Sequence, residues 1–196
     1  MKGWHKTSFV DYPGRIASVF FYGGCNFRCP FCHNKDLVLS PRTQQNVNRE
    51  DIVSYITRRT HLYDGICLTG GEPTLAPTLT EDIAALRETG LPIKLDTNGT
   101  RPQVLEKLVK SGAIQYVAMD VKGAPGCYAD LVADPSQARK VIEAVRTSVT
   151  YLKEQRDIPC EFRSTLYPPL FQAHFLSDIA EWIEGADNYF LQPFNP

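Results

Sequence analysis

The chain has 196 residues, of which 43% are hydrophobic and 22% charged, and its 21 lysines and arginines face 22 aspartates and glutamates. This composition is typical of a globular protein, and it lacks the basic excess that a nucleic-acid-binding surface needs. The length predicts a single domain over residues 1–196, because no internal repeat or low-complexity linker argues for a second one.

The first residues favour a cytoplasmic protein. The apolar run at residues 19–22 is far too short to span a bilayer. Residues 1–5 are followed by polar residues rather than by the apolar core of a signal peptide. We therefore expect a cytoplasmic protein that binds neither a membrane nor nucleic acid.

Short strands alternate with helices after a turn at residues 11–14, whose sequence is DYPG. Six segments are rich in β-branched and aromatic residues and are bounded by Gly, Pro or Asn, which predicts strands. They are residues 16–22, 65–68, 92–96, 114–120, 160–166 and 188–193.

Five helical patterns lie between these strands, each with apolar residues on one face. Asn48 is a candidate cap of the first helix, Thr80 precedes the second, and Gly112 ends the third. Asp134 and Pro135 open a longer fourth helix, because proline is favoured at the first helical position. The core face of the fifth helix consists of Phe175, Ile179, Trp182 and Ile183.

This regular alternation implies right-handed βαβ units and a parallel sheet. A complete eight-unit barrel usually needs about 250 residues, so the chain is short for one. The predicted elements therefore leave two α/β architectures open. One is a partial barrel that is open on one side, and the other is a doubly wound open sheet.

Three cysteines lie within eight residues in the loop after the first strand, GGCNFRCPFCHN at residues 23–34. Their spacing, C-x3-C-x2-C, indicates metal or redox chemistry rather than disulfides in a reducing compartment. The other three cysteines occur singly, and we expect them to be small buried hydrophobic residues. They are Cys67, Cys127 and Cys160.

Three thiolates are one ligand short of a closed tetrahedral zinc site. The nearest fourth ligand is His33, but it directly follows Cys32, and consecutive residues rarely both turn toward one ion. No second C-x2-C pair is present in the sequence. A cubane iron–sulfur cluster accommodates three protein thiolates better, because its fourth iron stays free to bind another ligand.

Polar or glycine-rich turns also follow the next three strands: TGGEPT at residues 69–74, DTNGT at 96–100 and DVKG at 120–123. Active sites of parallel α/β proteins form where the chain leaves the carboxyl ends of the strands. We therefore expect the cysteine loop and these three turns to form one site.

Together these motifs resemble the radical S-adenosylmethionine (radical SAM) superfamily, in which a cysteine loop with an aromatic residue before its last cysteine is followed by a strand ending in Gly-Gly-Glu-Pro. DYPG, DTNG, DVK and EFRSTLYP at residues 161–168 narrow the resemblance to the activating enzymes of glycyl radical enzymes. The chain is most similar to the activating proteins of anaerobic ribonucleoside-triphosphate reductase, and pyruvate formate-lyase activases resemble it more distantly. The resemblance covers nearly the whole chain and implies a partial (β/α)6 TIM-like barrel with parallel strands.

The resemblance also implies a function and two cofactors, a [4Fe-4S] cluster and S-adenosylmethionine. The reduced cluster would cleave S-adenosylmethionine to methionine and a 5′-deoxyadenosyl radical, which would generate a glycyl radical on a partner enzyme. That partner would be anaerobic ribonucleotide reductase. Electrons would come from a donor such as flavodoxin or ferredoxin.

Under this resemblance, the residues of the cysteine loop have defined roles. Cys25, Cys29 and Cys32 are the cluster ligands and are central to catalysis. Phe31 and His33 line the adenine side of the cofactor. A single cluster is implied, because the chain has no second group of cysteines.

The turn after the second strand would contact the methionine part of the cofactor, and the turn after the third strand would offer further contacts with the cofactor. Gly70 and Gly71 allow close approach of the backbone, because glycine has no Cβ. Their neighbour Glu72 belongs to the same turn. Thr97 and Asn98 in DTNG are further candidate contacts.

The charged residues of the remaining motifs complete the implied site. Lys122 would pair with the cofactor carboxylate beside Asp120, and Asp96, Thr97 and Asp120 resemble a monovalent-cation site for Na⁺ or K⁺. Arg163 is either an anion clamp, which its guanidinium geometry favours, or a salt-bridge partner inside the barrel.

One position departs from the larger activases. Asn195 stands where the pyruvate formate-lyase enzyme has a histidine that contacts the cofactor. Asparagine can still form a hydrogen bond there, but it cannot titrate.

Two other functions remain open at this stage. One is a radical enzyme for a small molecule, such as 7-carboxy-7-deazaguanine synthase, which is similarly short but lacks the combination of an uninterrupted C-x3-C-x2-C loop with DYPG. The other is a non-catalytic zinc or iron–sulfur module, which would leave the strand-end turns unexplained.

Overall fold

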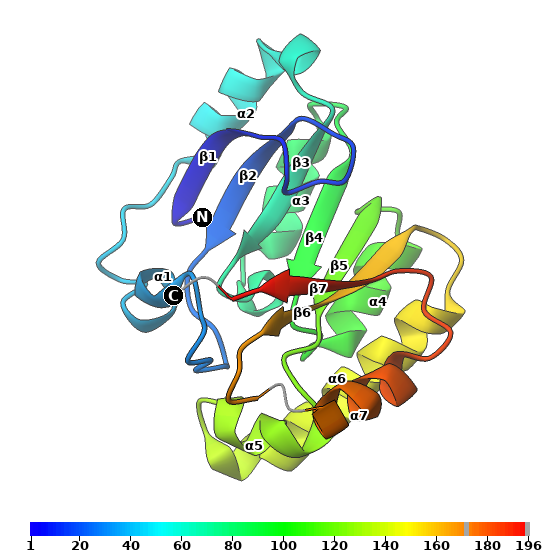
Figure 1. The fold of residues 1–196 in the computed structure, drawn as a ribbon. Helices are drawn as coiled ribbons and strands as arrows, with labels where there is room; N and C mark the ends of the chain where they lie inside the picture. Colours follow the sequence, from blue (N-terminus) through cyan, green and yellow to red (C-terminus); the bar gives the residue numbers. More distant parts are fainter. Residues whose placement is uncertain (171–172, 195–196) are drawn as a thin grey trace.

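The computed structural model describes residues 1–170 and 173–194. These residues form a seven-stranded sheet with the strands in sequence order (Figure 1). Strands β2 to β7 are parallel, and β1 pairs antiparallel with β2. The strands are β1 Gly3–Ser8, β2 Ala17–Tyr22, β3 Gly65–Gly70, β4 Ile93–Thr97, β5 Tyr116–Asp120, β6 Cys160–Leu166 and β7 Tyr189–Pro193.

The six parallel strands confirm the predicted partial barrel, and their bounds agree with the predicted segments to within two residues at each end. The antiparallel strand β1 was not predicted. Its sequence, GWHKTS, lacks an apolar alternation because β1 is an edge strand, with three of its six residues exposed.

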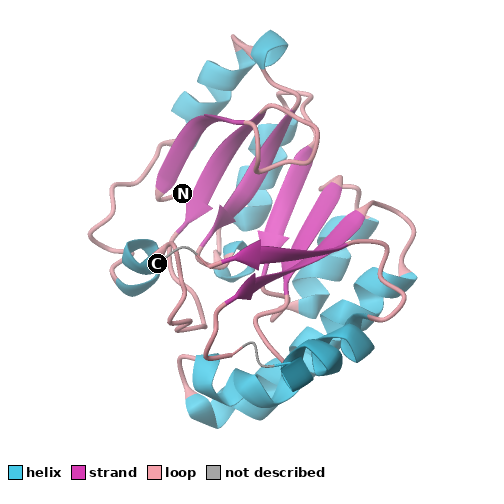
Figure 2. Cartoon of the chain, viewed as in Figure 1, coloured by secondary structure: helices cyan, strands magenta, loops and turns pink. Residues whose placement is uncertain are grey.

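The helices lie on one side of the curved sheet (Figure 2). They are α1 Lys35–Leu39, α2 Arg49–Thr57, α3 Leu79–Arg87, α4 Pro102–Lys110, α5 Tyr128–Leu131, α6 Ala138–Glu154 and α7 Ala173–Ile183. The short helices α1 and α5 were not predicted, since neither is long enough to show a helical period. Within the described residues, no helix is both long enough and apolar enough to cross a membrane.

The predicted helix starts are partly correct. The Asn48 side chain accepts hydrogen bonds from the backbone N–H groups of Glu50 and Asp51, at 2.7 and 3.3 Å, and so caps α2 as predicted. Helix α3 begins earlier than predicted, with Thr78 in the capping position rather than Thr80. The side chain of Asp134 caps only a 3-10 turn, and the long helix α6 starts just after that turn.

Strand alternation separates an apolar layer from a polar one. On β4, Ile93 and Leu95 are fully buried in the apolar core together with residues of the helices. The side chains between and after them, Lys94 and Asp96, form an ion pair with each other. Because successive side chains on a strand point to opposite faces, the inner face of the partial barrel is polar and charged.

The DYPG turn lies near the amino ends of β3 and β5. Tyr12 is buried, its ring centroid lies 5.6 Å from that of Tyr116, and a Cβ at Gly65 would come within 2.8 Å of its ring. Gly65 and Tyr116 are the first residues of β3 and β5. The turn therefore packs at the end of the barrel opposite to the strand-end motifs.

The three single cysteines are buried as predicted. Cys67 on β3, Cys127 and Cys160 on β6 have exposed fractions of 0%, 6% and 7%. None of the six cysteines, all of which lie in the described part of the chain, forms a disulfide.

Candidate functional site

The cysteine loop and the carboxyl ends of strands β3 to β7 surround a pocket of about 170 Å³. The pocket brings together all but one of the predicted site residues that the structure describes. They are Cys25, Cys29, Phe31, Cys32, His33, Gly70, Gly71, Glu72, Asp96, Thr97, Asn98, Asp120 and Lys122. Arg163 does not line the pocket, and Asn195 lies outside the described residues.

The three thiols of the cysteine loop are free and half-buried. Burial raises the pKa of Cys25, and it raises the pKa of Cys29 to about 11 although the nearby ammonium of Lys122 acts to lower it. Iron ligation requires thiolates, so cluster binding must displace protons from these groups.

The donor set of this loop fits an iron–sulfur cluster. Among the described residues, no three His, Cys, Asp or Glu side chains are grouped so that they could hold a metal ion. The thiolates that bind a cubane cluster each hold a different iron, so they line a common pocket without meeting at one point. Cys25, Cys29 and Cys32 have this arrangement.

The Gly-Gly turn after β3 supports the cysteine loop directly. The backbone N–H of Glu72 donates to the carbonyl oxygen of Gly24 at 2.8 Å, and Gly71 donates to the carbonyl oxygen of Tyr22 at 2.8 Å. A Cβ at Gly71 would lie 2.0 Å from the Gly24 oxygen, and one at Gly70, where φ is +116°, would lie 2.4 Å from the Tyr22 nitrogen. Both positions therefore require glycine because another part of the chain itself lies in close contact. In the sequence analysis, this requirement was attributed to close approach of the cofactor.

Glu72 ties this turn to the turn after β4. It is 1% exposed, and its carboxylate accepts hydrogen bonds from the hydroxyls of Thr97 and Thr74, at 2.8 and 2.5 Å, and from the Asn98 and Thr74 backbone N–H groups, at 2.7 and 3.0 Å. Burial raises the pKa of Glu72, whereas these hydrogen bonds act to lower it. Although Glu72 lines the pocket, its oxygen atoms are occupied by the protein's own donors.

Three asparagines hold the cysteine loop from the side. The Asn98 amide lies 3.7 Å from the Cys25 sulfur and donates to the Asn26 side-chain oxygen at 3.0 Å. Asn34 donates to the carbonyl oxygen of Gly70 at 3.0 Å. Asn26 and Asn34 were not predicted from the sequence as site residues. Their position within the cysteine stretch was the feature of the sequence that could have indicated them.

An aromatic wall borders the other side of the pocket. The Phe31 ring centroid lies 5.4 Å from that of Tyr167, which in turn lies 5.1 Å from that of Phe194 in an edge-to-face contact. A second pocket of about 520 Å³ lies beside this wall and shares Phe31, Cys32, His33 and Asn34 with the first. Thus Phe31 and His33 lie where the two pockets meet.

The ion pairs of the inner face begin with Asp120. Its two carboxylate oxygens receive Lys122 at 2.8 Å and Arg163 at 2.9 Å. Burial alone would raise the pKa of Asp120, but these two cations hold it well below its usual range. Burial alone would also lower the pKa of Lys122, but Asp120 raises it, so both groups are charged at neutral pH.

Arg163 joins three acidic side chains, two of which line the pocket. Besides Asp120, its guanidinium contacts Asp96 at 3.3 Å and Glu161 at 3.9 Å. Two roles were considered for Arg163, and in the structure it is the salt-bridge partner inside the barrel. Lys94, which the sequence-based reasoning did not select, pairs with Asp96 from the opposite side.

The cysteine loop also has an outward-facing side. A separate pocket of about 150 Å³ is lined by Cys29 and Cys32 together with Arg28, Lys35, Val38 and Leu39. Arg28 and Lys35 are exposed, and Leu39 is 61% exposed. Cys29 and Cys32 therefore border this separate pocket, which is lined by two basic side chains and two apolar ones, as well as the inner pocket.

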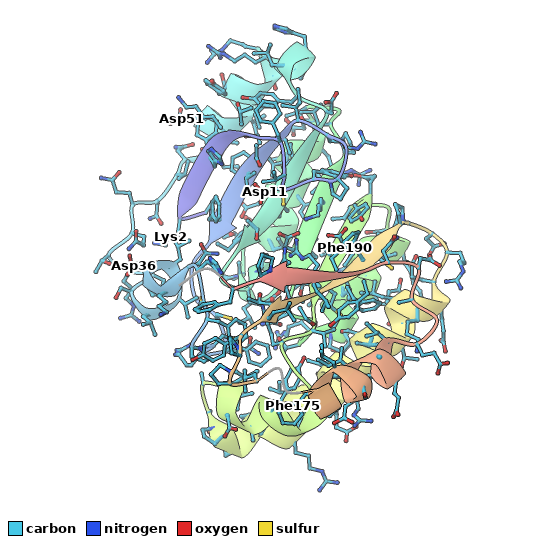
Figure 3. All side chains as sticks on the ribbon, viewed as in Figure 1. Lys2, Asp11, Asp36, Asp51, Phe175 and Phe190 are labelled. Atoms are coloured by element: carbon cyan, nitrogen blue, oxygen red, sulfur yellow. The ribbon has the colours of Figure 1, made fainter. Side chains whose placement is uncertain are left out.

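Strand β7 leaves apolar side chains exposed at the open edge of the barrel. Phe190, labelled in Figure 3, is 49% exposed and Leu191 is 47% exposed. Gln192, the next residue, lines the inner pocket. The open edge thus continues directly into the wall of the site.

Comparison with known proteins identifies relatives of this site and fold. The sequence profile of the Radical SAM superfamily matches residues 19–169. A protein of Methanocaldococcus jannaschii named "Putative glycyl-radical enzyme activating enzyme" is 35% identical over 198 residues, which cover 100% of this chain and 80% of the relative. A pyruvate formate-lyase-activating enzyme of Clostridium pasteurianum is 31% identical over 118 residues, which cover 58% of this chain and 48% of the relative.

A solved structure confirms the fold. The crystal structure of Streptococcus suis SuiB bound to S-adenosylmethionine matches with a TM-score of 0.66 and 16% identity, covering 91% of this chain and 40% of SuiB. At this identity the likeness establishes a common fold rather than a common substrate. The aligned residues thus cover less than half of SuiB and of the clostridial relative.

Proposed function

Because the chain belongs to the radical SAM superfamily, we propose that it is an activating enzyme that generates a glycyl radical on a partner protein. The observation that carries this proposal is the convergence of three free thiols and the strand-end turns on one pocket. The full-length similarity to the archaeal relative supports glycyl radical formation over other radical reactions.

The two cofactors that the family implies are a [4Fe-4S] cluster and S-adenosylmethionine. The thiols of Cys25, Cys29 and Cys32 would hold the cluster, because they are free and line the same pocket. When bound, the reduced cluster and S-adenosylmethionine supply one-electron cleavage of a carbon–sulfur bond and the abstraction of a glycine hydrogen.

Residues of the pocket would orient S-adenosylmethionine by charge and shape. The ammonium of Lys122 is held in the pocket wall by Asp120 and suits the cofactor carboxylate. The aromatic wall that contains Phe31 suits the adenine ring, since a pocket of about 520 Å³ lies beside it. His33 would lie next to the adenosine part, as predicted from the sequence.

The partner would present its glycine at the open edge of the barrel. Phe190 and Leu191 offer apolar surface there, and Gln192 on the same strand reaches the pocket. We infer that this partner is an anaerobic ribonucleotide reductase, a proposal that rests on the motifs of the sequence.

The electron donor would dock on the outward side of the cysteine loop. The exposed Arg28 and Lys35 would attract an acidic docking surface on a donor such as flavodoxin or ferredoxin. Leu39 would add apolar contact close to Cys29 and Cys32.

The test combines cluster reconstitution with a cysteine replacement. The wild-type protein is reconstituted without oxygen, reduced and mixed with S-adenosylmethionine. Glycyl radical formation is then followed by EPR on anaerobic ribonucleotide reductase and, separately, on pyruvate formate-lyase. We expect a radical on the former, while cleavage of S-adenosylmethionine with no radical on either protein would favour a small-molecule substrate.

Cys29→Ala should lose iron binding and S-adenosylmethionine cleavage together. Cys127→Ala is the matched control, because Cys127 is buried outside the loop and should leave both unchanged. Full cleavage by Cys29→Ala would remove Cys29 from the ligand set and contradict the assignment of the site.

A further inference from the structure

Lys94 is a fully buried lysine at the centre of the barrel. It lies on β4 with an exposed fraction of 0%, and its ammonium pairs with the Asp96 carboxylate. The Cys67 sulfur lies 3.9 Å from the same nitrogen, in agreement with the direct pairing of Cys67 and Lys94 in the β3–β4 register. A buried ammonium is costly unless it is paired, so this ion pair needs an explanation.

The predicted ligands of a monovalent cation are already occupied by groups of the protein. The two oxygens of Asp96 face Lys94 and Arg163, and the two oxygens of Asp120 face Lys122 and Arg163. The Thr97 hydroxyl donates to Glu72 at 2.8 Å. No carboxylate oxygen of the predicted Na⁺ or K⁺ site therefore lacks a cationic partner.

The charges of this cluster also balance. Three cations, Lys94, Lys122 and Arg163, are joined in a chain of ion pairs to three acidic groups, Asp96, Asp120 and Glu161. A further cation would give this cluster a net positive charge, which is unfavourable in a poorly solvated interior.

We propose that the Lys94 ammonium is the built-in counter-cation of Asp96, so that the pocket works without bound Na⁺ or K⁺. Lys94 is a positioning residue in this proposal, because it does not line the pocket and acts through Asp96, which does. Asp96 in turn holds Arg163, which holds Asp120 and thereby Lys122 in the pocket wall.

The charge state of Lys94 agrees with this role. Burial alone would lower the pKa of Lys94, but the neighbouring Asp96 carboxylate raises it overall. The ammonium therefore remains charged at neutral pH.

The first test uses the wild-type protein. Its thermal unfolding is measured in potassium, sodium and choline chloride at one ionic strength, and thallium(I), a potassium analogue, is titrated and followed by ²⁰⁵Tl NMR. We expect the same melting temperature in all three salts and no saturable thallium site. A saturable site in wild-type protein that is lost in Asp96→Asn would overturn the proposal.

The second test creates the need for a cation. Lys94→Met keeps an unbranched side chain, one atom shorter than lysine, but leaves Asp96 with Arg163 as its single cationic partner. We expect Lys94→Met to melt lower than wild type in choline chloride and to recover, with saturation, in potassium or sodium chloride. If its melting temperature is equally low in all three salts, Lys94 has only a packing role and the proposal is wrong.

Two control variants separate charge from packing. Cys67→Ala removes the sulfur beside the Lys94 nitrogen without changing charge, so it should lower the melting temperature equally in every salt. The double variant Lys94→Met/Asp96→Asn removes both charges and should show no recovery with potassium. Should Lys94→Met fail to fold, the thallium titration of wild type still decides the question.

A third measurement rests on the proposed function. In choline chloride, reconstituted Lys94→Met should bind S-adenosylmethionine about tenfold more weakly than wild type, and potassium should restore most of the difference. If neither wild type nor Lys94→Met binds S-adenosylmethionine, the proposed function is wrong. The melting temperatures in the three salts and the thallium titration still test whether Lys94 is the counter-cation of Asp96. Binding that stays weak in potassium, alongside a recovered melting temperature, would refute the positioning role.

Discussion

Replacing Gly71 by alanine should displace the cysteine loop. The new Cβ would lie 2.0 Å from the Gly24 carbonyl oxygen and 2.8 Å from its carbon. Side-chain carbons essentially never approach other atoms closer than 3.0 Å, so the Gly24 carbonyl has to move by about 1 Å. That carbonyl accepts the 2.8 Å hydrogen bond from Glu72, which would be lost or stretched.

The size of the effect follows from two contributions. Forcing a methyl group into a filled space costs about 1–3 kcal/mol, and the lost backbone hydrogen bond adds about 1 kcal/mol. We therefore expect Gly71→Ala to lower the free energy of unfolding by about 2–4 kcal/mol. For a chain of this size, that corresponds to a fall in melting temperature of roughly 5–15 °C.

The assay is urea unfolding of the cluster-free protein, with the iron content after reconstitution as a second readout. Gly126→Ala is the matched control, because a Cβ there would meet no atom within 4 Å. It should change stability by less than about 0.5 kcal/mol. If Gly71→Ala unfolds at the same urea concentration as the control and binds as much iron, the close contact with Gly24 does not constrain the loop.

Three further predictions concern the charges and polar groups of the site. Asn98→Ala removes the amide that lies near the Cys25 sulfur. If this hydrogen bond contributes about 1 kcal/mol, the reduction potential of the cluster should become more negative by about 40 mV. An EPR-monitored redox titration measures the shift. An unchanged potential would show that this amide does not act on the cluster. Burial alone would raise the pKa of Asp120, but its two cationic partners lower it below the value of an unfolded chain. The stability advantage of wild type over Asp120→Asn should therefore be complete above about pH 4 and decline as the pH falls further. Urea unfolding of both proteins between about pH 3 and 7 measures this advantage, and a constant difference would contradict the prediction. Lys35→Glu should slow reduction of the cluster by an acidic carrier protein about tenfold at low salt, but leave its reduction by dithionite unchanged. Stopped-flow absorbance measures both rates. Equal slowing by Lys140→Glu, at an exposed lysine outside this pocket, would argue against a docking role for Lys35.

The motifs predicted the location of the site because its residues follow from strand order. Once alternating strands and helices imply a parallel sheet, loops such as 23–34 and 69–74 must meet at its carboxyl edge. Pattern and spacing alone therefore placed Cys25 and Lys122 on one pocket, as the structure confirms.

The partners inside the site could not be predicted, because they depend on the strand register. Asp120 pairs directly with Arg163 in the β5–β6 register, and Cys67 with Lys94 in the β3–β4 register. A one-residue shift would place these side chains on opposite faces of the sheet. The chain of ion pairs thus depends on the strand register, and the register cannot be predicted from the residue types of one strand alone.

The close contact of Gly71 with Gly24 was hidden for a similar reason. A Gly-Gly pair in a sequence indicates freedom of the backbone, but it does not say whether a ligand or another segment fills the space. Here another segment of the chain fills it.

The unequal burial of the six cysteines has a consequence for how the protein acquires iron. Cys67, Cys127 and Cys160 have exposed fractions of 0%, 6% and 7%, whereas Cys25, Cys29 and Cys32 are half-buried and line the pocket. An iron–sulfur donor therefore meets one accessible trio rather than the twenty trios that six thiols allow. The packing of the barrel therefore limits which thiols are within reach of a cluster donor in the folded protein.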